Sequence, residues 1–242
     1  MRRKQRLYLQ VAEILTDHIL SGKISPGEKL KTEAELCKQF DVSRATVREA
    51  LGHLESRGFI TRKHGIGSFV LGAADGIVAG LETLESFTAT IGRSGHKARE
   101  LILDIEKIRI KEQLATKMEV KTGSLGYSIK ALRLADGVPV NYSVDTLYAQ
   151  IINDPKRLNR RSQYESLLDF LDNEFDIHAN YGFMYLDAIE APANVAKVLK
   201  IKPQTPLLCV DGLVRQHNGQ PIYYSSNYFV TARYKFSFVR KR

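Results

Sequence analysis

The 242-residue chain has only two cysteines, no long apolar run and none of the common catalytic motifs. Cys37 and Cys209 are too few and too far apart for a disulfide framework or a zinc knot, so we expect buried or half-buried thiols. The basic start leads into an amphipathic helix without an apolar signal segment, which predicts a cytoplasmic protein that does not span a membrane. The six histidines are scattered, and HExxH, P-loop and nucleophile–base patterns are missing. We therefore predict no enzymatic activity, no metal site and no cofactor.

Charge is unevenly distributed along the chain, which has a net charge of +9. Residues 1–71 contain 13 Lys and Arg against 8 Asp and Glu, and the last ten residues contain five basic groups and no acid. A polyanionic partner for the amino-terminal region follows, because each phosphate that a protein neutralises releases counterions. The basic carboxyl-terminal tail, 240–242, is interpreted as a solvated end in preference to a DNA contact.

Residues 30–70 predict two short helices followed by a basic hairpin. Thr32 and Glu35 are spaced as a capping box, and Ser43 is a suitable cap for the second helix. The buried stripe of that helix has four apolar residues at helical spacing, Val47, Ala50, Leu51 and Leu54. Arg44 and Thr46 then lie in its first turn, and Arg48 faces outward.

Two short strands, 59–62 and 68–71, flank a basic turn whose glycines suit a tight hairpin. Helix, turn, helix and hairpin in this order indicate a winged helix-turn-helix, whose second helix enters the major groove of DNA. The alternative is a small helical subdomain with solvated arginines, which the joint order of cap, turn, arginine pair and basic wing makes less favourable.

The region from residue 77 onward contains an internal repeat with a shift of 82 residues. Asp136-Gly137 and Asn218-Gly219 are signals for type I′ turns between strand-forming runs, so each copy should be an antiparallel hairpin. Helices are predicted at four places, 83–93, 112–118, 164–173 and 193–199. We expect an α+β domain in which helices pack against one antiparallel sheet, and we expect the ligand site in the cleft between the two halves.

The amino-terminal residues resemble the DNA-binding domain of the GntR family of bacterial transcription regulators. The matching segments are 24–30, 42–51 and 64–70. The resemblance implies that Ser43, Arg44, Thr46, Arg48 and Gly65 contact operator DNA. With the flanking basic and polar positions, the predicted DNA-binding set is Lys31, Thr32, Ser43, Arg44, Thr46, Arg48, His64 and Gly65. Ala34 stands where the family usually has a base-reading arginine, which leaves the operator sequence open.

The second region resembles the effector domain of the HutC branch of that family, the UTRA domain, whose fold is shared with chorismate lyase. The resemblance covers roughly residues 77–239 and implies ligand contacts from Phe87, Thr88, Arg133 and Ser162. Departures at Ala131, Ser143, Tyr223 and Phe229 make a phosphosugar less favourable than a weakly anionic, partly apolar effector. The full predicted effector-binding set is Phe87, Thr88, Arg133, Ser143, Ser162, Glu190, Tyr223 and Tyr228.

Simpler roles stay open for several of these residues. Arg133 and Arg215 occupy equivalent repeat positions and are equally consistent with ion pairs to neighbouring carboxylates. Tyr223, Tyr224 and Tyr228 suit packing in the sheet better than a ligand cage.

The predicted organisation is a winged helix-turn-helix at 1–71, a linker at 72–76 and a UTRA-like effector-binding and dimerisation domain at 77–242. We expect a homodimeric, ligand-responsive regulator of transcription that binds double-stranded operator DNA. A small anionic metabolite would release this repressor from a pseudo-palindromic operator. The alternatives are a chorismate-lyase-like enzyme fused to a DNA-binding domain, and a DNA-binding protein without an effector.

Overall fold

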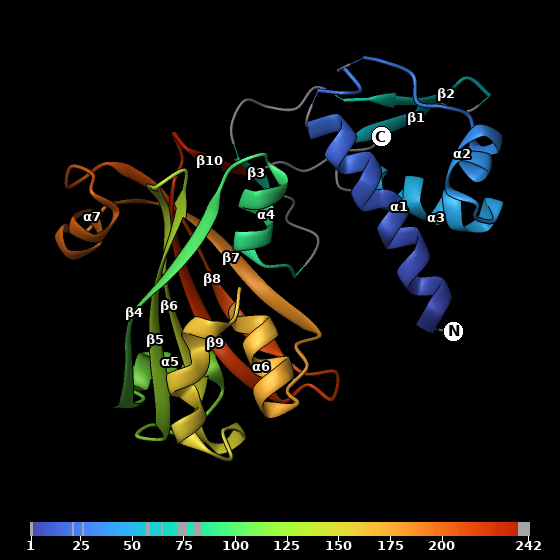
Figure 1. Ribbon diagram of the computed structural model, residues 1–242. Coiled ribbons are helices and arrows are strands. Elements are labelled where there is room, and N and C mark those ends of the chain that lie inside the picture. The colour runs from blue at the N-terminus through green and yellow to red at the C-terminus, as the bar shows by residue number, and fades with distance from the viewer. Residues whose placement is uncertain are drawn as a thin grey trace. The chain divides into compact units, whose positions relative to one another are not determined.

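The computed structural model describes residues 2–20, 22–25, 27–56, 59–63, 65–71, 77–79 and 84–236 (Figure 1). The predicted linker at 72–76, His64 and the basic tail lie outside these residues. The chain divides into two compact units, one of residues 1–83, 93–95 and 235–242, the other of residues 84–92 and 96–234. No described helix is long and apolar enough to cross a membrane.

The first unit is a three-helix domain with a two-stranded wing. Its elements are α1 (Arg2–Leu20), α2 (Glu33–Phe40), α3 (Arg44–Ser56), β1 (Ile60–Lys63) and β2 (Gly67–Val70). β1 and β2 form an antiparallel hairpin, and a further two-stranded pair joins β3 (Ile77–Ala79) to β10 (Tyr234–Phe236). This arrangement confirms the predicted winged helix-turn-helix.

The local signals that start and orient its helices are confirmed. Thr32 Oγ1 accepts from the backbone N–H of Glu35 at 3.3 Å, while Glu35 Oε2 accepts from the backbone N–H of Thr32 at 2.7 Å, which is the predicted capping box. The stripe of α3 is buried, with Val47, Ala50 and Leu54 at 0% exposure. It packs against Val11, Leu15 and Ile19 of α1, so burial of apolar surface fixes the outward direction of the polar face of α3.

The second unit is a six-stranded antiparallel sheet in the order β4-β5-β6-β9-β8-β7. The strands are β4 (Ala98–Arg109), β5 (Leu125–Ala135), β6 (Val138–Tyr148), β7 (Tyr181–Glu190), β8 (Pro206–Arg215) and β9 (Pro221–Val230). The helical elements are α4 (Phe87–Arg93), α5 (Glu112–Met118), η1 (Ala149–Ile151), η2 (Pro155–Gln163), α6 (Leu167–Phe175) and α7 (Ala193–Leu199).

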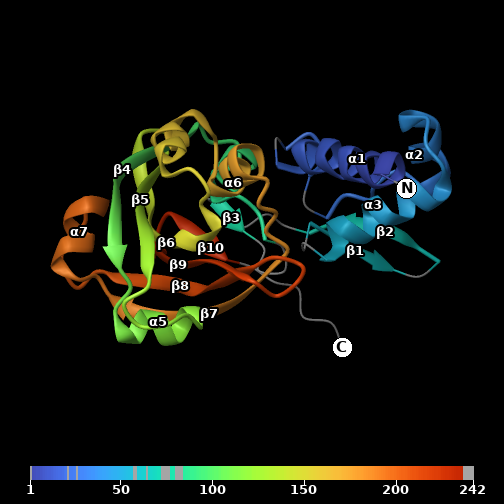
Figure 2. The same cartoon turned by 90° about the horizontal axis from the view of Figure 1, so that it is seen from below.

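The internal repeat explains this topology. Each half is a strand, a helix and a hairpin, β4-α5-β5-β6 and β7-α7-β8-β9, and the halves join where β6 pairs with β9. One face packs against α6, and the other packs against α5 and α7, so α6 and α5 lie on opposite sides of the sheet (Figure 2). The predicted α+β fold with one sheet made of two hairpins is therefore confirmed.

The turns and helix limits differ in detail from the prediction. Asp136 and Gly137 have φ of 50° and 81°, the left-handed values of the expected two-residue turn. The second hairpin instead has a five-residue loop, 216–220, in which only Gly219 has a positive φ and the Asn218 side chain accepts from the backbone N–H of Gln220. α5 and α7 agree with prediction, whereas α4 begins at Phe87 and α6 runs from Leu167 to Phe175, capped by Ser166.

Candidate DNA-binding groove and effector pocket

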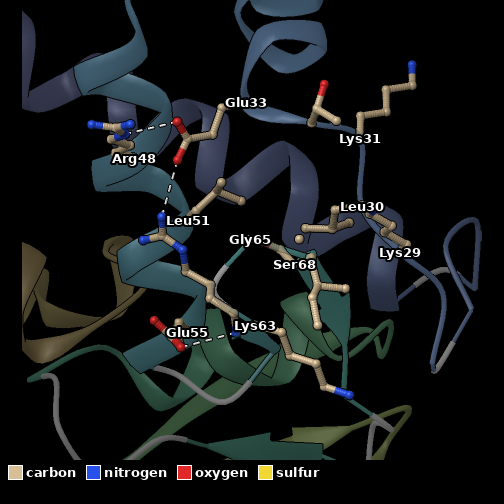
Figure 3. A pocket seen from close by; sticks show the side chains of 14 residues that line it. Lys29, Leu30, Lys31, Glu33, Arg48, Leu51, Glu55, Lys63, Gly65 and Ser68 are labelled. Carbon is tan, nitrogen blue, oxygen red and sulfur yellow. Dashed lines mark hydrogen bonds and ion pairs between the residues drawn. The ribbon is translucent and has the colours of Figure 1, made fainter.

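A groove of about 790 Å³ lies in the first unit between α3, the approach to α2 and the wing (Figure 3). Basic side chains surround it: Lys29, Lys31, Arg48, Arg62 and Lys63. Two carboxylates, Glu33 and Glu55, also line the groove, and Glu33 is bonded to both arginines, as the dashed lines that leave it in Figure 3 show. The groove therefore has a net positive lining, which suits a phosphate backbone.

Glu33 holds one arginine from the recognition helix and one from the wing. Its Oε2 is 2.9 Å from Arg48 Nε, and its Oε1 is 3.2 Å from Arg62 Nη2. Each guanidinium has five N–H donors, so each keeps donors for another ligand. Arg62 was not among the predicted site residues, although its place on a basic hairpin next to the turn was the available signal.

The predicted DNA-binding residues on α3 differ in exposure: the two arginines are exposed and the threonine is buried. Arg44 and Arg48 are exposed on the polar face, as expected. Thr46 is buried, at 3% exposure, and its hydroxyl lies 2.9 Å from Ser43 Oγ, while its backbone N–H donates to Ser43 Oγ at 3.2 Å. The Thr46 side chain thus points inward, where it contacts the cap of α3, and its contact with DNA stays a prediction.

Three more of the predicted DNA-binding residues, Lys31, Thr32 and Gly65, line the groove. Lys31 lines it and donates to Gln39 Oε1 at 2.8 Å, and the Thr32 hydroxyl is engaged by the capping box. Gly65 lies in the wing turn with a φ of 72°, a conformation that favours glycine. Gly67 approaches the stem of Lys29 so closely that a Cβ there would lie 2.6 Å from Lys29 Cε.

In the second unit, a buried ion-pair cluster lies between the sheet and η2. Glu100 of β4 is 2.7 Å from Arg133 Nη2 and 2.5 Å from Arg161 Nη2, and both arginines are almost fully buried. Arg133 also donates to Asn141 Oδ1 at 2.6 Å and to Ser143 Oγ at 3.2 Å. The structure therefore shows Arg133 in an ion pair with a carboxylate, which is one of the two roles that the sequence left open for it. The equivalent Arg215 likewise pairs with Glu119.

The polar network continues from Arg133 across the junction of the two halves. Ser143 Oγ donates to Asp145 at 3.1 Å, and Ser225 Oγ of β9 donates to the same carboxyl at 2.5 Å. Burial raises the pKa of Asp145, and the nearby Arg133 guanidinium offsets only part of that effect. Two guanidiniums therefore face one carboxylate, Glu100, and one carboxyl that is held toward its neutral form.

A pocket of about 420 Å³ opens beside Glu100. Among its lining residues are Thr88 of α4, Ser162 of η2 and Tyr164. Thr88 Oγ1 is buried without a hydrogen-bond partner among the described residues, and so are the Nε atoms of Arg133 and Arg161. Such unpaired groups are costly in a folded protein unless a ligand or water satisfies them. The pocket lies beside β4, to one side of the junction at which the ligand cleft was expected.

Five predicted effector-binding residues lie in or around this cluster and its pocket: Phe87, Thr88, Arg133, Ser143 and Ser162. The other three, Glu190, Tyr223 and Tyr228, lie apart from it or within the core. Phe87 contacts Arg133, whose Cζ lies 5.7 Å from the ring centre. Tyr223 is buried in the core, where burial raises its pKa. Tyr228 lies on the opposite face of the sheet, because successive residues of β9 point to opposite faces. Its ring stacks on that of Tyr142, with ring centres 6.0 Å apart.

Glu190 is exposed at the end of β7, the edge strand farthest from β4. Arg161 was missed by the sequence reasoning, because its segment is strongly polar and gave no signal of burial. Within the described residues, no three His, Cys, Asp or Glu side chains are grouped as a metal site requires.

Comparisons with known proteins match both units. Residues 7–70 match the bacterial regulatory proteins of the gntR family, and residues 93–235 match the UTRA domain. The chain is 27% identical over 231 residues to the uncharacterized HTH-type transcriptional regulator YurK of Bacillus subtilis, covering 96% of this chain and 94% of YurK. It is 26% identical over 230 residues to the HTH-type transcriptional repressor NagR of the same organism, covering 95% and 93%.

The fold also matches a solved structure of a relative. The crystal structure of the possible transcriptional regulator YydK from Bacillus subtilis superposes with a TM-score of 0.74 at 19% identity, covering 97% of this chain and 99% of that one. Because the UTRA match alone covers more than half of the chain, and the gntR match covers the region before it, the chain belongs to the GntR family of bacterial regulatory proteins, as a UTRA-containing transcription regulator and not an enzyme.

Proposed function

We propose that this regulator is a repressor that binds a pseudo-palindromic operator as a homodimer and is released by a small, singly anionic metabolite. Relatives named as repressors support the sign of regulation. Its DNA target lies in the cytoplasm of a bacterium, where we expect the protein to act. The observation that carries the effector part is the buried, unpaired Thr88 hydroxyl beside a cluster of two arginines and one carboxylate.

The DNA-binding part rests on the polar face of α3 and the wing. Arg44 and Arg48 are exposed on α3, the helix of a winged helix-turn-helix that enters the major groove, and Lys31 and Gly65 line the groove beside Arg48. We expect Arg44 and Arg48 to contact base edges and the lysines to contact phosphates. Alanine at Arg44 should therefore relax the sequence preference, with a cost in discrimination of about 1–3 kcal/mol.

The effector part follows from charge and from unpaired donors. Two guanidiniums, of Arg133 and Arg161, share the single carboxylate Glu100, and burial raises the pKa of the nearby Asp145. A ligand with one negative charge suits this cluster of two cations and one paired anion, and its polar atoms provide an acceptor for Thr88 Oγ1 and for the arginine Nε donors. The aromatic ring of Phe87 beside Arg133 suits a partly apolar ligand.

A thermal-shift screen of singly anionic metabolites against the full chain tests this proposal. A ligand that binds the folded state raises the melting temperature by mass action, and the same ligand should release operator DNA. Thr88→Val removes one hydroxyl with little change in volume and should weaken that ligand about 10-fold, the loss expected when a polar ligand group is left unpaired.

Thr116→Val is the matched control, because Thr116 is exposed on α5 at the opposite face of the sheet. A protein that binds its operator equally well with every metabolite, and whose melting temperature none of them raises, would instead be an effector-independent regulator.

A further inference from the structure

The carboxylate of Glu100 separates the pocket beside β4 from the two arginines of the buried cluster. Glu100 lines that pocket, whereas Arg133 and Arg161 are not among its lining residues. The Glu100 side chain is only 5% exposed, and those of Arg133 and Arg161 are 7% and 1% exposed. An anion that enters the pocket therefore meets a carboxylate first, and the guanidiniums lie beyond it.

Strand register fixes Glu100 in this position. In the β4–β5 pair, Glu100 is directly opposite Arg133, so the two side chains project from the same face of the sheet. The oxygens of Glu100 divide between two guanidiniums: Oε1 is 2.7 Å from Arg133 Nη2, and Oε2 is 2.5 Å from Arg161 Nη2. The two guanidiniums are therefore spaced so that a single carboxylate spans them.

The other acidic residues of β4 have a different environment. Asp104 and Glu106 are 46% and 48% exposed, and both pair with Lys130. Exposed pairs of this kind contribute little to stability, because solvent screens them. Of the three acidic side chains on β4, Glu100 alone is buried and shared by two arginines.

Glu100 fills this anion site incompletely. Although its Oε1 lies close to Arg133, that oxygen makes no hydrogen bond among the described residues, and neither do the Nε atoms of Arg133 and Arg161. A carboxylate that bonds one guanidinium side by side makes two parallel hydrogen bonds, which is a strong arrangement for this pair. The site therefore keeps donors that a free carboxylate, not tethered to β4, can reach.

We propose that Glu100 is an internal competitor of the effector, whose own carboxylate takes the place of Glu100 between Arg133 and Arg161. This inference rests on the proposed function and narrows the anionic group of the effector to a carboxylate, the group that the two guanidiniums already hold. The pocket of about 420 Å³ has room for the displaced Glu100 side chain. The two other charged residues that line it, Arg99 and Glu165, are opposite in sign, so together they neither attract nor repel an anion.

An internal competitor makes the site selective. The arginines are available only in the fraction of molecules in which Glu100 has left them, so the apparent affinity for every carboxylate is lowered by that fraction. Simple carboxylates are therefore rejected, and a ligand needs further contacts in the pocket, such as the Thr88 hydroxyl, to bind at low concentration.

Titration of Glu100→Gln with sodium acetate, followed by the melting temperature of the full chain, tests the proposal. Glutamine keeps the shape of glutamate but removes the competing charge, so acetate should bind at least ~10-fold more tightly than to the wild type, the effect of losing one competing charge-assisted hydrogen bond. Sodium chloride at the same ionic strength corrects for screening. Glu106→Gln is the matched control, because it removes an exposed carboxylate from the same strand.

Addition of Arg161→Gln to Glu100→Gln should abolish the gain, because acetate then loses one of its two guanidiniums. A gain in Glu100→Gln that is missing from Glu106→Gln and from the double variant supports the proposal. Equal acetate binding by Glu100→Gln and the wild type overturns it, and so does a gain for inorganic phosphate without one for acetate. If Glu100→Gln does not fold, Glu100→Asp decides, because it draws the carboxylate back by one methylene; acetate binding no tighter than in the wild type then overturns the proposal.

The metabolite screen against the wild type tests the effector separately. A chain whose Glu100→Gln variant gains acetate binding, but which responds to no metabolite, contradicts the proposed function. A chain that responds to a metabolite, but whose variant gains no acetate binding, contradicts only the role of Glu100.

Discussion

Replacing Glu33 with glutamine tests how the DNA-binding groove is organised. The Glu33 carboxylate bonds both guanidiniums, with 2.9 Å to Arg48 Nε and 3.2 Å to Arg62 Nη2. The glutamine side chain keeps the shape of the glutamate and one acceptor oxygen, but it removes the negative charge and one of the two acceptors. The substitution therefore frees one arginine of the pair while the fold of α2 and α3 is retained.

Two opposing effects on DNA binding follow from this change. Removing a negative charge from a basic groove strengthens binding to every sequence, because phosphates are no longer repelled by the carboxylate. Loss of the fixed orientation of Arg48 weakens its contact with bases, and a bidentate arginine contact contributes about 1–3 kcal/mol to discrimination. Because the glutamine keeps only one of the two acceptor oxygens that orient the arginines, we expect the ratio of specific to non-specific affinity to fall about 5- to 10-fold.

The stability effect should be small in comparison. Arg48 is 64% exposed and Arg62 is 35% exposed, so both ion pairs are screened by solvent. Exposed pairs of this kind contribute about 0.2–1 kcal/mol each. The melting temperature of Glu33→Gln should therefore stay close to that of the wild type, which separates an effect on recognition from an effect on folding.

Fluorescence anisotropy measures both affinities, with an operator duplex selected from random DNA and a shuffled duplex of the same length. Glu13→Gln on α1 is the control, because it removes an exposed acid from the same unit without touching the groove. If Glu33→Gln strengthens both affinities equally and leaves their ratio unchanged, Glu33 acts only through its charge and does not position the arginines.

Three further results are expected. Arg62→Ala should weaken operator binding and lower the salt slope of log K by about one, measured by the same anisotropy titration, whereas an unchanged slope would remove Arg62 from the DNA contacts. Leu54→Ala should destabilise the first unit by about 2–5 kcal/mol through an unfilled cavity, measured by hydrogen exchange of α3 amides, and a smaller loss would mean that the site collapses. Asp145→Asn should raise the melting temperature at pH 8. Because the folded-state pKa of Asp145 is raised, its contribution to stability is lost as pH rises, so the gain should shrink as pH falls toward 4; a gain independent of pH would contradict this.

Local signals predicted the first unit well because its structure depends on neighbours in sequence. The Thr32 cap bonds a residue three positions away, and the α3 stripe repeats every three or four residues, so spacing alone determined both. The first-turn position of Thr46 was also predicted, but spacing alone did not reveal that its side chain is buried and that its hydroxyl lies beside Ser43 Oγ.

The effector domain was predictable as a repeat but not as a site. Two hairpin signals located the central strands, and α5 and α7 agreed with their predicted limits. Contacts between Glu100 and two arginines depend on strand register and on how η2 folds over the sheet, which no spacing within the sequence reveals. Successive side chains of a strand point to opposite faces of the sheet, so the sequence alone already placed Tyr228 and Tyr223 on different faces.

The repeat also explains why the polar network lies where it does. β6 and β9 are the last strands of their halves, and their pairing brings equivalent residues of the two copies together at the centre of the sheet. Asp145 accepts from Ser143 of its own strand and from Ser225 of the other half, which is the repeat equivalent of Ser143. A ligand that perturbs Arg133 therefore acts on a carboxyl held by both halves. If the proposed effector binds beside Arg133, we expect both halves to share the response, because the bonds of one buried hydrogen-bond network polarise one another.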